Sequence, residues 1–80
     1  MNNSAIDVVN KLLRQLCSLE DITPSMSIIE DIGMDSLSVV LFIVDLENEL
    51  NVLINDSDLD PASLITVSDL YELATKYMNA

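Results

Sequence analysis

The stretch that decides the fold runs from Glu30 to Leu50 and reads EDIGMDSLSVVLFIVDLENEL. From Ser36 onward its apolar residues recur at helical spacing, and at about 100° per residue they gather on two opposite faces. One face is narrow enough to be a core-facing stripe and consists of Val39, Phe42, Ile43, Leu46 and Leu50. The other face begins directly after Ser36 and consists of Leu37, Val40, Leu41 and Val44. The pattern therefore predicts a helix with one buried apolar face and a second one left over.

This second face, which we call the docking face, is bordered by carboxylates. Asp45 and Glu49 lie on one edge and Glu47 on the other, and we call these three residues the acidic rim. A small single-layer domain cannot bury both faces of one helix, and the charged border favours exposure to solvent. Exposed apolar patches with polar borders mark interaction sites. We therefore expect partners to recognise the docking face and the acidic rim, beside a reactive or modified Ser36.

Composition limits the possible functions. The 80 residues suffice for one domain with one modest core, and half of them are hydrophobic while tryptophan is absent. A single glycine and two prolines favour a mostly helical chain. Cys17 is the only cysteine, so an internal disulfide is excluded. We expect its thiol to be buried. Fourteen acidic residues against three basic ones give a net charge of -11, which disfavours nucleic acids and anionic membranes and favours partners with basic patches.

Three further helices complete the expected fold. A first helix is predicted to begin at Ser4, and the last to be capped by Thr66 with Asp69 in the capping-box position. Between them, a run of acidic residues before Pro61 indicates a short third helix whose first turn contains that proline. The sequence thus predicts an all-α fold, an up-and-down bundle of three main helices plus a short third helix, with residues 1–80 forming a single domain.

The long connection before the Ser36 helix is expected to be ordered rather than flexible. It contains three isoleucines that are predicted to pin it to the core, namely Ile28, Ile29 and Ile32. Gly33 then supplies the backbone freedom needed for a sharp turn into the helix.

The motif Asp35-Ser36-Leu37 at this helix start resembles the attachment motif of acyl and peptidyl carrier proteins. The preceding residues 30–33, the amphipathic helix with late acidic residues, and the closing segment 64–70 match the same family. The resemblance covers essentially the whole chain, and the combination is far more specific than the three-residue motif alone.

The resemblance implies that Ser36 carries a 4'-phosphopantetheine arm, installed from coenzyme A by a magnesium-dependent phosphopantetheinyl transferase with Asp35 near the metal. A helix N-terminus stabilises the resulting phosphodiester anion. The arm would hold acyl or aminoacyl groups as thioesters, supplied by an adenylating or acyl-loading enzyme and used by condensing, modifying or releasing enzymes. The carrier itself would catalyse nothing, so neither catalytic residues nor a metal of its own are expected.

A hydrolase is the first alternative, because Gly33-Met34-Asp35-Ser36-Leu37 looks like the Gly-Asp-Ser-Leu box of some lipases. Met34 interrupts that box, and the chain has no histidine to deprotonate a serine nucleophile. The sequence therefore excludes a conventional serine hydrolase.

Two further alternatives are a calcium loop and a helical adaptor. Asp56, Asp58 and Asp60 imitate the start of an EF-hand loop, but Pro61 occupies the glycine position and Val67 the position of the bidentate glutamate. An acidic surface turn is thus favoured. An adaptor would use the docking face alone, with Ser36 serving merely as a helix cap.

The finer expectation is a free-standing, monomeric, cytoplasmic carrier without membrane insertion. Ser38 and Leu41 are uncharged where fatty-acid carriers typically continue with acidic residues, which favours a polyketide or nonribosomal peptide type pathway of secondary metabolism. The acidic rim keeps fatty-acid synthesis open as the alternative. The apolar run at residues 39–44 is too short to cross a bilayer, and the N-terminus has no targeting pattern.

Overall fold

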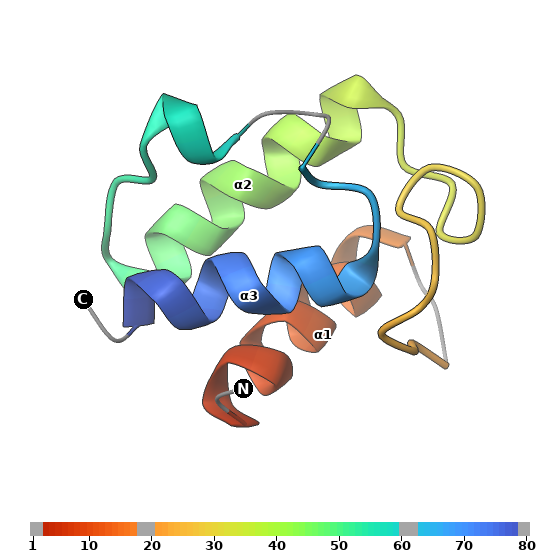
Figure 1. The fold of residues 1–80 in the computed structure, drawn as a ribbon, viewed down its shortest axis with the longest axis horizontal. Coiled ribbons are helices and arrows are strands. Elements are labelled where there is room, and N and C mark those ends of the chain that lie inside the picture. The colour runs from red at the N-terminus through yellow and green to blue at the C-terminus, as the bar shows by residue number, and fades with distance from the viewer. Residues whose placement is uncertain (1–2, 18–20, 60–62, 79–80) are drawn as a thin grey trace.

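The computed structural model describes residues 3–17, 21–59 and 63–78. In chain order they form α1 (Asn3–Cys17), α2 (Ser36–Leu50), the single 3₁₀ turn η1 (Asp56–Asp58) and α3 (Val67–Met78) (Figure 1). The expectation of an all-α bundle of three main helices with a short additional helix is confirmed.

The helices are arranged around α1. It packs against both α2 and α3, which touch each other less than either touches α1. Figure 1 shows that α1 and α2 run in opposite directions, whereas α2 and α3 start at the same end of the molecule and run the same way. This parallel pair differs from the up-and-down alternation expected from the sequence, and the long connection after Leu50 makes it possible by returning the chain to the end where α2 begins.

The core consists mainly of aliphatic side chains from all three helices and both connections, with Phe42 and Tyr71 as its aromatic members. Phe42 and Leu46 of α2 have no exposed surface, and Ile43 is buried beside them, so the predicted core stripe of this helix is confirmed. Val39 and Leu50 of the same stripe are partly buried against the core. The other fully or nearly fully buried large side chains are Val9, Leu12, Leu13, Ile28, Met34, Val67, Leu70 and Tyr71.

The connection before α2 is ordered, as predicted. Ile28 donates its backbone N–H to the carbonyl of Ile65 (2.9 Å), and Val67 donates to the carbonyl of Met26 (3.0 Å), so the connection is fastened to the start of α3. Gly33 has a φ of 83°, a conformation that glycine adopts without strain. This fastening fixes where α2 begins.

The prediction that Ile29 is buried is wrong. Asp31 and Ile32 both donate their backbone N–H groups to the carbonyl of Ser27, which closes a single helical turn. In such a turn residues four apart share one side, so Ile28 and Ile32 point to the core while Ile29 is 57% exposed.

The ends of the helices follow the sequence signals closely but not in every case. The carboxylate of Asp69 accepts the N–H groups of Ile65 and Thr66, both at 2.9 Å, which confirms the capping arrangement at α3. At the other end of the chain, α1 begins at Asn3, one residue before the predicted start. The short helix predicted at Pro61 falls on positions outside the described residues, and the helical turn that is observed lies earlier, at Asp56–Asp58.

The opposite faces of α2 should respond differently to substitution. Phe42→Ala empties a fully buried site and should lower the free energy of unfolding by about 3–5 kcal/mol. Leu41→Asp changes a half-exposed side chain and should cost less than about 1 kcal/mol. Urea denaturation of both variants measures the difference, and equal losses would contradict the assignment of the two faces.

Candidate functional site

The site is built around the first turn of α2. Asp35 occupies the N-cap position, where its side chain accepts the backbone N–H of Ser38 at 2.8 Å. Ser36 is therefore the first helical residue and not the cap, which removes the interpretation of this serine as a capping residue. Its side chain is exposed beside the positive end of the helix dipole.

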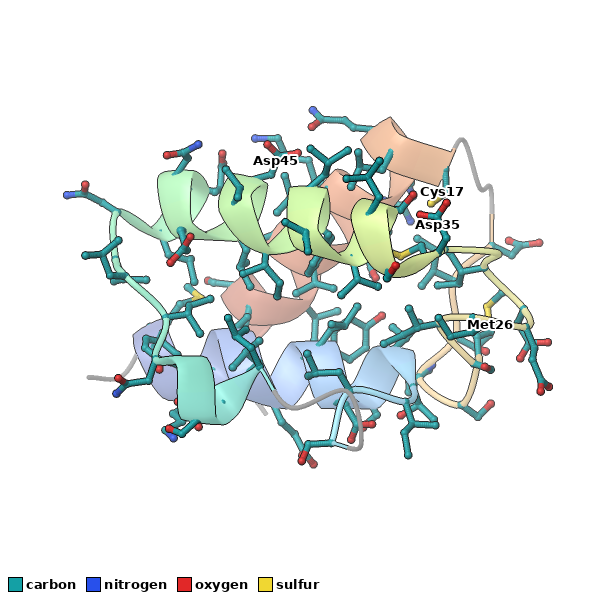
Figure 2. All side chains as sticks on the ribbon, turned by 90° about the horizontal axis from the view of Figure 1, so that it is seen from above. Cys17, Met26, Asp35 and Asp45 are labelled. Atoms are coloured by element: carbon teal, nitrogen blue, oxygen red, sulfur yellow. The ribbon has the colours of Figure 1, made fainter. Side chains whose placement is uncertain are left out.

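Asp35 is suited to remain ionised at this position. The hydrogen bond from the Ser38 backbone N–H, helped by the Ser38 hydroxyl, lowers the pKa of Asp35 from its ordinary value. A carboxylate that neighbours an exposed hydroxyl can hold a divalent cation during transfer of a phosphate-containing group to that hydroxyl. Figure 2 shows Asp35 at the end of α2 nearest the preceding connection.

The docking face is exposed, as the sequence predicts. Its exposed fractions are 66% for Leu37, 56% for Val40, 49% for Leu41 and 46% for Val44. These side chains begin next to Ser36 and continue along the helix, so an enzyme that works on a group at Ser36 would meet them first. Side chains of this size lose water on contact and can anchor a partner.

The acidic rim differs from the sequence-based expectation in one respect. Glu49 forms an ion pair with Lys11 of α1 (2.8 Å), a contact between helices that the periodicity of α2 does not predict. Glu47 accepts the backbone N–H of Ile54 at 2.9 Å and so holds the connection after α2. Asp45 is half-buried and has no ion pair among the described residues. The rim thus has structural contacts of its own besides any role in recognition.

A cavity of about 490 Å³ lies along α2 and starts at Ser36. Its polar lining residues in the described part of the chain are Ser36 and Glu47. Its apolar lining comes from α2, from Ile29, and from the connection to α3, and comprises Ile29, Val39, Val40, Ile43, Val44, Ile54, Leu59 and Leu64. Sequence reasoning missed this cavity, because the wall opposite α2 comes from an irregular segment without periodicity.

The connection that forms this wall is fastened at two places. Ile54 is held by Glu47, and the next residue, Asn55, donates its backbone N–H to the Tyr77 hydroxyl at 2.8 Å. Asp58 binds the Lys76 ammonium (2.8 Å) through one oxygen and the Tyr77 hydroxyl through the other.

These bonds also bear on the calcium alternative. The Lys76 ammonium, followed by the Tyr77 hydroxyl, lowers the pKa of the Asp58 carboxyl, whose oxygens serve this attachment. Asp60 and Pro61 lie outside the described residues, as does the side chain of Asp56. In the described part of the chain, the Asp58 carboxylate thus serves to attach η1 to α3.

The free thiol of Cys17 lies at the end of α1, and in the view of Figure 2 it appears beside Asp35. It is partly buried against the core rather than fully buried. Desolvation raises its pKa, which lowers its reactivity near neutral pH.

The exposed Ser36 hydroxyl, the ionised Asp35 and the adjoining apolar cavity fit a phosphopantetheine arm with an attached group. The chain matches the phosphopantetheine attachment site family over residues 6–74. It belongs to this family of carrier proteins. Members carry covalently attached 4'-phosphopantetheine and act as carriers, not catalysts.

Curated relatives agree with this assignment. The chain is 35% identical to the acyl carrier protein of Syntrophobacter fumaroxidans over 72 residues, 89% of this chain and 86% of the relative. It is 36% identical to the acyl carrier protein of Desulforapulum autotrophicum over 58 residues, 72% of this chain and 73% of that protein. Among the described residues of this carrier, no helix is long and apolar enough to span a membrane.

Acid should destabilise this carrier. Hydrogen bonds lower the pKa values of Asp35, Asp58 and Asp69 in the folded chain, so near pH 4 the unfolded chain binds more protons. Their stabilisation is present above about pH 4 and is lost as the pH falls through the folded-state values. Melting temperatures between pH 6 and pH 2.5 measure this loss.

Asp69 offers the clearest single test of this prediction. Asp69→Asn should melt lower at pH 7 and lose less on acidification than the wild type, because it no longer binds that proton. Glu72→Gln, which removes an exposed carboxylate from the same helix, is the matched control. Identical acid profiles for Asp69→Asn and the wild type would contradict the assigned role.

Proposed function

We propose that Ser36 is the attachment site of the arm, and that the protein holds acyl or aminoacyl intermediates on it as thioesters. This proposal rests on the arrangement at the start of α2. Asp35 caps the helix, and the Ser36 side chain next to it is exposed. The transferase would join the arm to the Ser36 oxygen as a phosphodiester, with the remainder of coenzyme A as leaving group. The helix N-terminus would stabilise the new anion.

The docking face gives the partner enzymes their contact. A transferase, a loading enzyme and the downstream condensing, modifying or releasing enzymes must each approach Ser36, and the exposed apolar side chains that follow it on the helix begin with Leu37, Val40 and Leu41. The engagement of Glu47 with Ile54 and of Glu49 with Lys11 supports recognition that depends more on apolar contact than on the acidic rim.

For the pathway, we propose secondary metabolism of the polyketide or nonribosomal peptide type, on the strength of this apolar docking face. Fatty-acid synthesis is the second candidate. It is supported by the relatives that are named acyl carrier proteins and by the apolar cavity beside Ser36, which suits an alkyl chain. Both candidates use the same arm and the same serine.

Attachment can be tested by intact mass. Incubation with coenzyme A, magnesium and a broad-specificity phosphopantetheinyl transferase should add one phosphopantetheine to the wild type. Ser36→Ala should remain folded and unmodified, whereas Ser38→Ala, which removes the hydroxyl of a partly buried serine in the same turn, should still gain the arm. An unchanged wild-type mass, under conditions that modify a known carrier, would refute the proposal.

Loading distinguishes the two pathways. The modified protein should be offered to adenylating enzymes of the source cell and, separately, to its malonyl transferase and fatty-acid ketosynthase. Secondary metabolism predicts efficient acylation by an adenylating or specialised loading enzyme, and Leu41→Asp should reduce it at least tenfold because it places charge in the apolar contact. Elongation by the fatty-acid enzymes alone would establish the second candidate.

A further inference from the structure

Glu47 is the feature that the carrier role leaves unexplained. It lines the cavity that begins at Ser36, and the remaining described lining residues, Ser36 aside, are apolar. Glu47 takes part in no ion pair in the described part of the chain, where the two ion pairs join Lys11 to Glu49 and Lys76 to Asp58. A carboxylate in an apolar lining without a basic partner is an unusual choice for a cavity that would hold only alkyl groups.

The carboxylate also has free acceptor capacity. Its Oε2 accepts the N–H of Ile54 at 2.9 Å. An ionised carboxylate offers about four lone-pair sites, so one bond leaves room for further donors. The bond to Ile54 orients the side chain, because it ties the end of α2 to the connection that forms the opposite wall of the cavity.

The position of Glu47 matches the reach of the arm. Glu47 lies eleven residues after Ser36 on the same helix, about 16 Å along its axis. The arm from phosphorus to sulfur spans about thirteen bonds, which corresponds to roughly 15 Å when extended like a peptide chain. Helical side chains lean toward the N-terminus, which brings the carboxylate closer to Ser36 than its Cα. An arm that follows the cavity therefore places its thioester near Glu47.

We propose that Glu47 is a cargo-selecting residue: its carboxylate binds an ammonium or other hydrogen-bond donor on the first atoms of the thioester cargo. This inference rests on the proposed attachment at Ser36. A cationic cargo gains a charge-assisted hydrogen bond at the end of the cavity. A carboxylate-bearing cargo, such as a malonyl group, is repelled from the same position. The carrier is thereby matched to amino-bearing acyl groups.

The test uses wild-type protein loaded with three cargos of similar size by transferring the arm from the corresponding coenzyme A thioesters. These are 3-aminopropanoyl, butanoyl and malonyl groups. The backbone amide of Ile54 is the reporter, because its N–H binds the Glu47 carboxylate directly. In ¹H–¹⁵N spectra, 3-aminopropanoyl should shift the Ile54 amide in a way that butanoyl and malonyl do not reproduce. Equal Ile54 shifts for all three cargos would overturn the proposal.

Substitution provides the second readout. Glu47→Gln removes the charge and keeps an oxygen that can accept the Ile54 N–H, while Glu49→Gln removes a carboxylate that faces Lys11 and is the matched control. In wild-type protein and Glu49→Gln, the 3-aminopropanoyl thioester should hydrolyse about two- to fivefold more slowly than in Glu47→Gln. This is the effect expected for a partly exposed ion pair between the Glu47 carboxylate and the cargo ammonium. Butanoyl should hydrolyse equally in all three proteins.

The measurements distinguish a failure of attachment at Ser36 from a failure of the role proposed for Glu47. If no arm is added, the intact mass stays unchanged and the attachment at Ser36 falls together with this inference. If the arm is added but 3-aminopropanoyl hydrolyses equally in wild type and Glu47→Gln, the role of Glu47 is wrong and the carrier assignment stands.

Discussion

The structure depends on one constraint: α2 has apolar side chains on two faces, and a domain of this size can bury only one. Phe42 and Leu46 have no exposed surface, so their face is committed to the core against α1. The orientation of the helix then leaves Leu37 and Leu41 toward solvent, where they contribute little to the core and remain open to a partner. The exposed apolar face of α2 is thus a consequence of how the core is packed.

The same orientation determines where Ser36 lies. The connection before α2 is fastened to the start of α3 by the bond between Ile28 and Ile65, and Gly33 turns the chain sharply into the helix. Asp35 then supplies the cap, so that the adjacent serine needs no role in helix stability. A serine whose side chain does not cap the helix can be modified without loss of the fold, which is the physical requirement for an attachment site.

Local signals made much of this predictable from sequence. The two faces of α2 follow from helical periodicity, and the cap of α3 follows from the spacing of Thr66 and Asp69. Prediction failed where neighbours in space decide the outcome. The exposure of Ile29 depends on a turn closed by Ser27. The ion pair of Lys11 with Glu49 joins two residues that are 38 positions apart in the sequence. Neither contact has a periodic signature, and the cavity wall formed by Ile54 and Leu59 lacks one for the same reason.

The acidic residues act differently at long range and in close contact with a partner. A net charge of -11 disfavours the approach of anions to the protein as a whole and steers basic partners from a distance. Close contact is another matter, because Glu49 already has Lys11 and Glu47 is turned toward Ile54 and the cavity. Long-range attraction therefore comes from the sum of the carboxylates, whereas the exposed apolar side chains around Ser36 would gain by losing water where a partner covers them.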